Sequence, residues 1–211
     1  MTSILRGTLA ALTFTSTVWL AATPAAADDY ETCAQASGDQ AIAACTRAID
    51  SGRYSGRELA ALFTNRCVEL NDTQGDKAIA DCSQAIRLDP DGAAAFSGRA
   101  GAYRAIGQYD RAIEDMNQAI RLSPNDADMF NNRGLAHHEN GQYDRAIEDF
   151  NQTIRLAPNE AIAFYNRGMS WERKNDLQRA LADFRKFSEL APSDPDGPKA
   201  IERVTKALSG R

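Results

Sequence analysis

The sequence has no excess of positive charge. Its 24 Lys and Arg residues are outnumbered by 29 Asp and Glu residues, and the formal net charge is −5. Proteins that bind nucleic acid usually carry a basic patch or stripe that contacts phosphates. The charge balance therefore argues against nucleic acid as a partner.

Histidine is almost absent. The only two, His137 and His138, are adjacent, and adjacent side chains on a helix point about 100° apart, too far for a shared metal site. We expect His137 to fill a core position and His138 to face a binding groove. The sequence also lacks the Gly-x-Ser-x-Gly, phosphate-loop and His-Glu-x-x-His motifs. We therefore predict no catalytic site, no bound metal and no cofactor.

Long apolar runs are missing beyond the first 27 residues. Residues 1–27 combine Arg6, an apolar run over 8–22 and the small-residue tract 25–27, which is typical of a secretory signal. The alternative is an uncleaved anchor, but the run has 15 residues and a spanning helix needs roughly 20. We expect cleavage after Ala27, a secreted and periplasmic protein, and no stable membrane insertion after cleavage.

One block of sequence occurs twice. Residues 107–125 (GQYDRAIEDMNQAIRLSPN) return 34 residues later as 141–159 (GQYDRAIEDFNQTIRLAPN), and 16 of the 19 positions are identical. A repeat of this size and period is typical of stacked helical units, each of which buries its apolar face against a neighbour. The chain is therefore predicted to be an all-α solenoid.

The apolar pattern extends the repeat in both directions. We predict a partial helical hairpin over 28–56, a repeat-like unit over 57–90, full repeats over 91–124, 125–158 and 159–192, and a capping helix over 193–211. In each full repeat the first helix carries an aromatic residue, a small residue four positions on and a ring three further on. Phe130, Gly134 and His137 are one such set. Asn175 stands where other units have a turn glycine, a role that asparagine can also fill.

The cysteines lie in the N-terminal half. Cys33, Cys45, Cys67 and Cys82 could form disulfides after export, and the sequence alone allows three pairings. The repeat register favours Cys33 with Cys45 and Cys67 with Cys82, because each pair then joins the two helices of one hairpin. A metal site is the alternative, but no Cys-x-x-Cys motif supports it.

This pattern resembles the tetratricopeptide repeat, over about residues 28–192. The resemblance implies a right-handed superhelical solenoid of antiparallel helix hairpins, closed by a C-terminal capping helix. It also implies a scaffold that is not an enzyme and that binds a protein or peptide partner in a concave groove. The first helices line this groove, so that in unit 91–124 the residues Ala94, Ser97, Gly98, Gly101 and Arg104 are expected to project into it.

Asparagines recur at one groove position. Asn65, Asn132 and Asn166 are equivalent in successive units, and Gly98 breaks the row. Asparagine offers both a donor and an acceptor to an extended peptide backbone, and members of the family hold peptides in this way. The alternative is that these amides bridge or cap neighbouring first helices.

A second apolar stripe lies on the first helix of the last repeat. Ile162, Tyr165 and Met169 share one face, near Leu135 of the preceding unit. The stripe could pack on adjacent first helices, or it could form an exposed anchor site for a ligand. A clamp of groove lysines for an acidic tail is not expected, because these equivalent positions carry other residues: Thr64, Ser97 and Asn131.

The second helices carry paired acids. Arg111 and Arg145 lie four residues before Asp115 and Asp149, a spacing that predicts a solvated, ion-paired face. Taken together, the sequence predicts an adaptor that binds a peptide or helix of an envelope protein. The alternative is a self-assembling structural protein that forms a homo-oligomer through its repeat edges.

Overall fold

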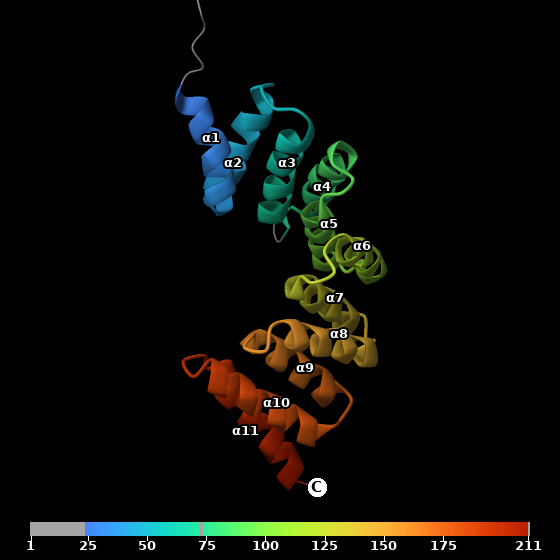
Figure 1. The fold of residues 1–211 in the computed structure, drawn as a ribbon. Coiled ribbons are helices and arrows are strands. Elements are labelled where there is room, and N and C mark those ends of the chain that lie inside the picture. Colours follow the sequence, from blue (N-terminus) through green and yellow to red (C-terminus); the bar gives the residue numbers. More distant parts are fainter. Residues whose placement is uncertain (1–23, 72–73, 211) are drawn as a thin grey trace, which may run out of the picture.

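The computed structural model describes residues 24–71 and 74–210, which form eleven α-helices (Figure 1). The helices are α1 (Pro24–Gln35), α2 (Gly38–Asp50), α3 (Gly56–Leu70), α4 (Gly75–Leu88), α5 (Ala93–Ala105), α6 (Tyr109–Leu122), α7 (Ala127–Glu139), α8 (Tyr143–Leu156), α9 (Ala161–Arg173), α10 (Leu177–Leu190) and α11 (Asp196–Ser209). Residues 1–23, which hold most of the predicted signal, lie outside the described residues. In the part that is described, every helix is too short or too polar to cross a membrane.

Consecutive helices pack in pairs along a curved path. Figure 1 shows the chain running from α1 at one end of the curve to α11 at the other. The tightest contacts join α3 to α4, α5 to α6, α7 to α8 and α9 to α10. Successive first helices also contact one another, α3 with α5, α5 with α7 and α7 with α9. Among the described residues, successive second helices do not make contacts of that extent. The first helices therefore line the inner side of the curve, and the predicted all-α solenoid of hairpins is confirmed.

The turns inside the hairpins require a left-handed backbone. Gly107 and Gly141 both have φ of +75°, and Asn175 has φ of +64° at the equivalent point. Glycine adopts this conformation without steric cost, and asparagine tolerates it better than most other residues. The sequence-based prediction for Asn175 is therefore confirmed.

Small residues let the two helices of a hairpin approach closely. A Cβ atom added to Gly134 would lie only 2.6 Å from Cε1 of Phe150, and one added to Gly168 would lie 2.9 Å from Cε1 of Phe184. Both phenylalanines are fully buried. Each glycine therefore leaves the space that the ring of the facing helix fills.

The aspartates of the second helices, Asp115 and Asp149, are not on a solvated face, so the prediction was wrong for them, whereas the adjacent Glu114 and Glu148 are exposed. Asp149 is only 5% exposed, and its two carboxylate oxygens accept hydrogen bonds from Nη2 and Nε of Arg133 at 2.6 and 2.8 Å. Nη1 of Arg133 also donates to Asn117 on the preceding second helix, at 2.7 Å. Arg145, the expected partner, instead bonds Gln142.

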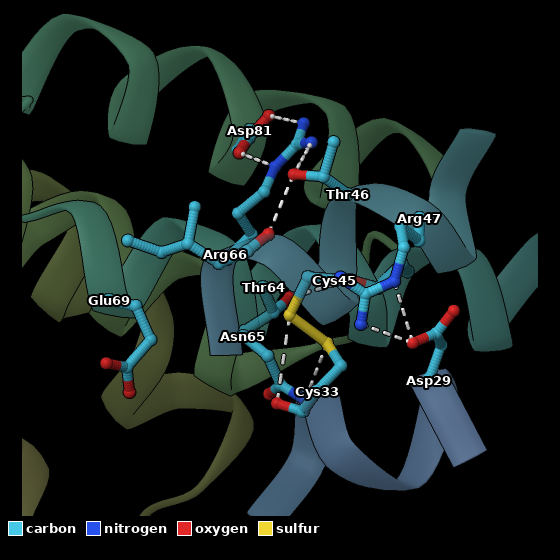
Figure 2. Close-up of a disulfide and its surroundings, with 12 residues drawn as sticks. Asp29, Cys33, Cys45, Thr46, Arg47, Thr64, Asn65, Arg66, Glu69 and Asp81 are labelled. Carbon is cyan, nitrogen blue, oxygen red and sulfur yellow. Dashed lines mark hydrogen bonds and ion pairs between the residues drawn. A yellow bond between two sulfur atoms is a disulfide. The ribbon is translucent and has the colours of Figure 1, made fainter. Parts of the chain in front are cut away.

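The same arginine clamp recurs in every unit from α3 onward. Arginines of first helices bind an Asp of their own hairpin and a polar residue of the preceding second helix, as follows: Arg66 with Asp81 and Thr46, Arg99 with Asp115 and Ser83, and Arg167 with Asp183 and Asn151. Figure 2 shows the first of these clamps. Each clamp joins three helices, because the guanidinium donates two hydrogen bonds to the carboxylate and has a further donor for the polar residue of the preceding second helix.

Two disulfides hold the N-terminal hairpins. Cys33 on α1 is bonded to Cys45 on α2 (Figure 2), and Cys67 on α3 is bonded to Cys82 on α4. The pairing favoured by the repeat register is thus the one that forms. All four sulfurs belong to buried residues, with at most 2% exposure.

The helix α11 covers the apolar edge of the last hairpin. Ala200 and Val204 are fully buried in a cluster with Leu181 and Phe184 of α10. The guanidinium of Arg203 donates two hydrogen bonds of 2.8 Å to the carboxylate of Glu172, which ties α11 to α9 as well.

Candidate functional site

A hollow of about 410 Å³ opens among α3, α5 and α7, on the inner side of the curve. Its lining includes Ala94, Ser97, Gly98 and Gly101, all of which belong to α5. All four residues were expected on the groove surface, but the hollow itself was not predicted from the sequence.

Two rows of groove-facing side chains are interrupted in the same helix. At the position of Asn132 the equivalent residue of α5 is Gly98, and at the position of Leu135 it is Gly101. A Cβ atom added to Gly101 would lie 2.7 Å from Nδ2 of Asn71, and one added to Gly98 would lie 3.3 Å from Cγ2 of Val68. The two glycines therefore let α5 pack closely against α3, and residues of α3 and α7 line the hollow beside it.

The floor of the hollow rests on a disulfide. A Cβ atom added to Gly98 would lie 2.8 Å from Sγ of Cys82 and 3.5 Å from Sγ of Cys67. Nδ2 of Asn71 donates a 3.2 Å hydrogen bond to the carbonyl oxygen of Gly98. The backbone of α5 is therefore held directly against the Cys67–Cys82 bond, which leaves no room for a larger residue at Gly98.

The walls of the hollow are partly apolar. Val68 of α3 is 50% exposed, so its aliphatic side chain presents apolar surface to the hollow. Met129 of α7 is half-buried, and Met116 of α6 lies deeper, at 3% exposure. Methionine adapts its shape to irregular gaps, so this lining suits an apolar side chain.

The rim of the hollow carries acids. Asp126 and Asp128 of the α7 N-terminus line it, and Oδ1 of Asp126 accepts a 3.0 Å hydrogen bond from the backbone N–H of Asp128. The one cation in the lining, Arg104, is bonded to Glu139 at 2.7 Å. Among the lining residues, no unpaired cation is left to neutralise Asp126 and Asp128.

The predicted asparagine row does not present one continuous surface. Asn132 lines the hollow and has no hydrogen-bond partner among the described residues. Nδ2 of Asn65 instead points at Sγ of Cys33, 4.0 Å away (Figure 2). Asn166 is 4% exposed and donates a 3.0 Å bond to Asn131. At Asn166 the geometry favours the second interpretation, a bridge between neighbouring first helices.

The predicted apolar stripe is divided between packing and exposure. The ring of Tyr165 lies 4.9 Å from that of Phe187, and both Tyr165 and Met169 pack against the cluster of α10 and α11. Leu135 is half-buried, whereas Ile162 is 44% exposed. Only Ile162 is exposed enough to serve as the anchor that the sequence suggested, because α11 packs beside the other end of the stripe.

The histidines lie outside the hollow. His137 is buried and its Nδ1 lies 2.9 Å from Oε1 of Gln142, while Nδ1 of His138 lies 2.8 Å from Oγ of Ser170. Burial is the main cause that lowers the pKa of both rings. Both rings are therefore biased towards the neutral form and serve packing between helices. In the described part of the chain, no three His, Cys, Asp or Glu side chains are grouped as metal ligands would be.

Comparison with protein families matches the C-terminal half of the chain. A family model for the TPR repeat matches residues 100–141, and one for the tetratricopeptide repeat matches residues 131–195. No curated protein matches the sequence.

Solved structures match a larger share of the fold. A crystal structure of MamA is 24% identical with a TM-score of 0.62, and the match covers 73% of this chain and 88% of that one. The first TPR of Spaghetti (RPAP3), bound to the HSP90 peptide SRMEEVD, is 22% identical with a TM-score of 0.55, covering 59% and 98%. The second TPR domain of human RPAP3, in complex with the HSP70 peptide SGPTIEEVD, is 25% identical with a TM-score of 0.50, covering 52% and 92%.

Proposed function

This chain belongs to the tetratricopeptide-repeat family, and from that premise we propose that it is a non-enzymatic scaffold whose hollow among α3, α5 and α7 binds an extended segment of another protein. The observation that carries the proposal is the hollow itself. Its volume of about 410 Å³ lies within the usual range of ligand sites. It is large enough for one or two side chains of a bound segment.

The contacts available in the hollow suit a peptide. The amide of Asn132 offers a donor and an acceptor, which is what an extended backbone presents in turn. Val68 and Met129 offer apolar surface for a side chain. Binding of this kind concentrates its free energy at a few buried anchors.

Two of the similar structures contain bound peptides, which supports a peptide site in this fold. Both peptides end in the acidic sequence EEVD. In this chain Ser97 and Asn131 occupy groove positions where a clamp for such a tail would need lysine. We therefore expect a ligand of different charge.

We further propose that the protein works outside the cytoplasm. Its two disulfides suit an oxidising compartment, and residues 1–27 have the composition of a secretory signal. The partner would then be an exposed segment of an envelope protein.

The test is to fill the hollow without disturbing the fold. Ala94 lines the hollow and is exposed, so Ala94→Phe places a ring in the binding space and none in the core. Ala105 is exposed on the same helix outside the hollow, and Ala105→Phe is the matched control. We expect a photo-crosslinker placed at Ser97 to capture a partner from envelope extract in the parent and the control, and to lose it with Ala94→Phe.

Two results would contradict the proposal. Capture that is unchanged by Ala94→Phe would mean that the hollow is not the binding surface. If the chain captures only further copies of itself, the homo-oligomer that the sequence left open becomes the better account.

A further inference from the structure

We infer that the hollow among α3, α5 and α7 selects a segment in which an apolar side chain is followed closely by Lys or Arg. The inference rests on the proposed function and specifies its ligand. It is carried by the chemistry of the lining, in which an apolar cavity and an acidic rim adjoin.

The apolar part of the ligand follows from the cavity. Val68 of α3 and Met129 of α7 line it from two sides of α5. The 50% exposure of Val68 means that this side chain keeps apolar surface in water. A Leu, Met or Phe side chain of the ligand would cover that surface and gain the corresponding burial.

The basic part follows from the charges around the cavity. Three charged residues line it, Asp126, Asp128 and Arg104. Arg104 forms an ion pair with Glu139 at 2.7 Å, so these two opposite charges cancel and neither changes the net charge of the rim. Asp128 is exposed and forms no ion pair among the described residues. The uncompensated charge is therefore that of the two aspartates.

The helix terminus does not reverse this charge. The N-terminus of α7 would attract an anion through its unpaired N–H groups, but Asp126 already accepts the N–H of Asp128 there. An acidic segment would meet two carboxylates, and like charges at this range repel. A basic side chain would meet both, with the apolar neighbour held in the cavity.

Spacing in an extended strand fits the two requirements together. Side chains two positions apart point to the same face and lie roughly 7 Å apart. Because Met129 and Asp128 are adjacent in sequence and both line the hollow, the apolar and charged contacts lie within reach of one short segment. We take the occupant to be a short extended stretch of a partner protein, in which both contacts come from residues close in sequence.

Defined peptides test the inference. Capped, labelled seven-residue peptides carry Leu at position three and Arg, Ser or Glu at position four, five or six, and their affinity for the protein with both disulfides formed is measured by fluorescence polarisation. We expect the Arg peptides to bind about fivefold more tightly than the Ser peptides, and the Glu peptides more weakly than either. Replacing Leu by Ser should reduce binding by about tenfold.

The acidic rim can be neutralised with a matched control. Asp126→Asn with Asp128→Asn removes both charges while asparagine keeps the capping bond. Asp194 and Asp196 make a similar contact at the start of α11, where the N–H of Asp196 donates to Asp194 at 2.9 Å and Asp196 also pairs with Lys199. Asp194→Asn with Asp196→Asn is thus a control that removes the same formal charge far from the hollow. The first pair should abolish the preference for Arg, and the control pair should preserve it within twofold.

The outcomes separate this inference from the proposed function. If Arg, Ser and Glu peptides bind equally and Ala94→Phe blocks all of them, the groove function stands and the charge inference is overturned. Preference for Glu overturns the inference in the same way. If no peptide binds, or if sedimentation shows a dimer that Ala94→Phe dissociates, the occupant is not a peptide segment and both proposals fall.

Discussion

At the scale of single residues, the arginine clamps are the polar contacts that recur in every unit from α3 onward. Asp149 is buried and accepts two bonds from Arg133. Asp149→Ala would leave that guanidinium without its carboxylate, so we expect the free energy of unfolding to fall by about 2 kcal/mol. Asp144 lies on the same helix with a side chain that is 77% exposed and pairs with Lys174.

Asp144→Ala is therefore the control, and it should change the free energy of unfolding by less than about 1 kcal/mol. Urea titration followed by circular dichroism measures both variants. Equal losses in the two would mean that the clamp adds nothing beyond a surface ion pair.

The clamps also show where sequence reasoning failed. Spacing of four residues predicted a pair between Arg145 and Asp149, because such residues adjoin on one helix. The actual partner, Arg133, comes from another helix and offers two parallel bonds with little loss of conformational freedom. Local spacing could not rank the two, since the choice depends on how closely α7 and α8 pack.

The histidines predict a dependence of stability on pH. Burial lowers the pKa of His137 and of His138 below the ordinary value of 6.5. As the pH falls below about 6.5, the unfolded chain binds protons that the folded chain does not, so the free energy of unfolding decreases. Urea titrations at about pH 7.5 and 5.5 should show this decrease, and His137→Tyr with His138→Gln should make it smaller. If the decrease in the free energy of unfolding keeps its size in this double variant, titratable groups other than the two histidines cause it.

At the scale of helices, α5 depends on the disulfide beneath it. Gly98 lies against Cys67 and Cys82, so Cys67→Ala with Cys82→Ala should speed amide exchange in α5. The disulfide between Cys33 and Cys45 joins α1 to α2, and Cys33→Ala with Cys45→Ala is the matched control. Hydrogen exchange with mass spectrometry compares them. Faster exchange of α5 in both variants would indicate general loosening of the N-terminal half.

The helix α11 should behave as a local cap. Val204 is fully buried, and Val204→Ala should cost about 2 kcal/mol. Because repeats contact only their neighbours, the faster amide exchange should be confined to α9, α10 and α11. Thr205→Ala, at the exposed neighbouring position, should leave exchange unchanged. Exchange that rises equally in α3 would contradict a local role.

Helix positions were predictable to within a few residues, and the misses have local causes. The capping helix was predicted over 193–211, whereas α11 spans Asp196–Ser209. Pro195 already has helical backbone angles, and its carbonyl oxygen accepts the N–H of Lys199, so the helix begins directly after this residue. The site was harder to predict, because the hollow is an empty space whose lining comes from several helices. The sequence shows Gly98 breaking one row, but the space beside it depends on Val68 and Met129 of two other helices.

At the scale of the whole molecule, stability should be unevenly distributed. Both disulfides lie within α1–α4, and they close loops of 12 and 15 residues. The chain-entropy model assigns roughly 3 kcal/mol to each loop of this size. In a solenoid this stabilisation is not shared with distant units. Reduction should therefore weaken the N-terminal half and leave the C-terminal half close to its original stability.

Trp171 makes this measurable, since it lies in α9 and is the only tryptophan after residue 27. Its fluorescence reports the C-terminal half, whereas circular dichroism reports all helices. With the disulfides intact we expect the two urea transitions to lie close together. After reduction the circular dichroism midpoint should move to lower urea while the fluorescence midpoint stays, because α1–α4 unfold first. Midpoints that shift together would mean that the chain unfolds as one cooperative unit, and that the disulfides stabilise the whole solenoid rather than its N-terminal half.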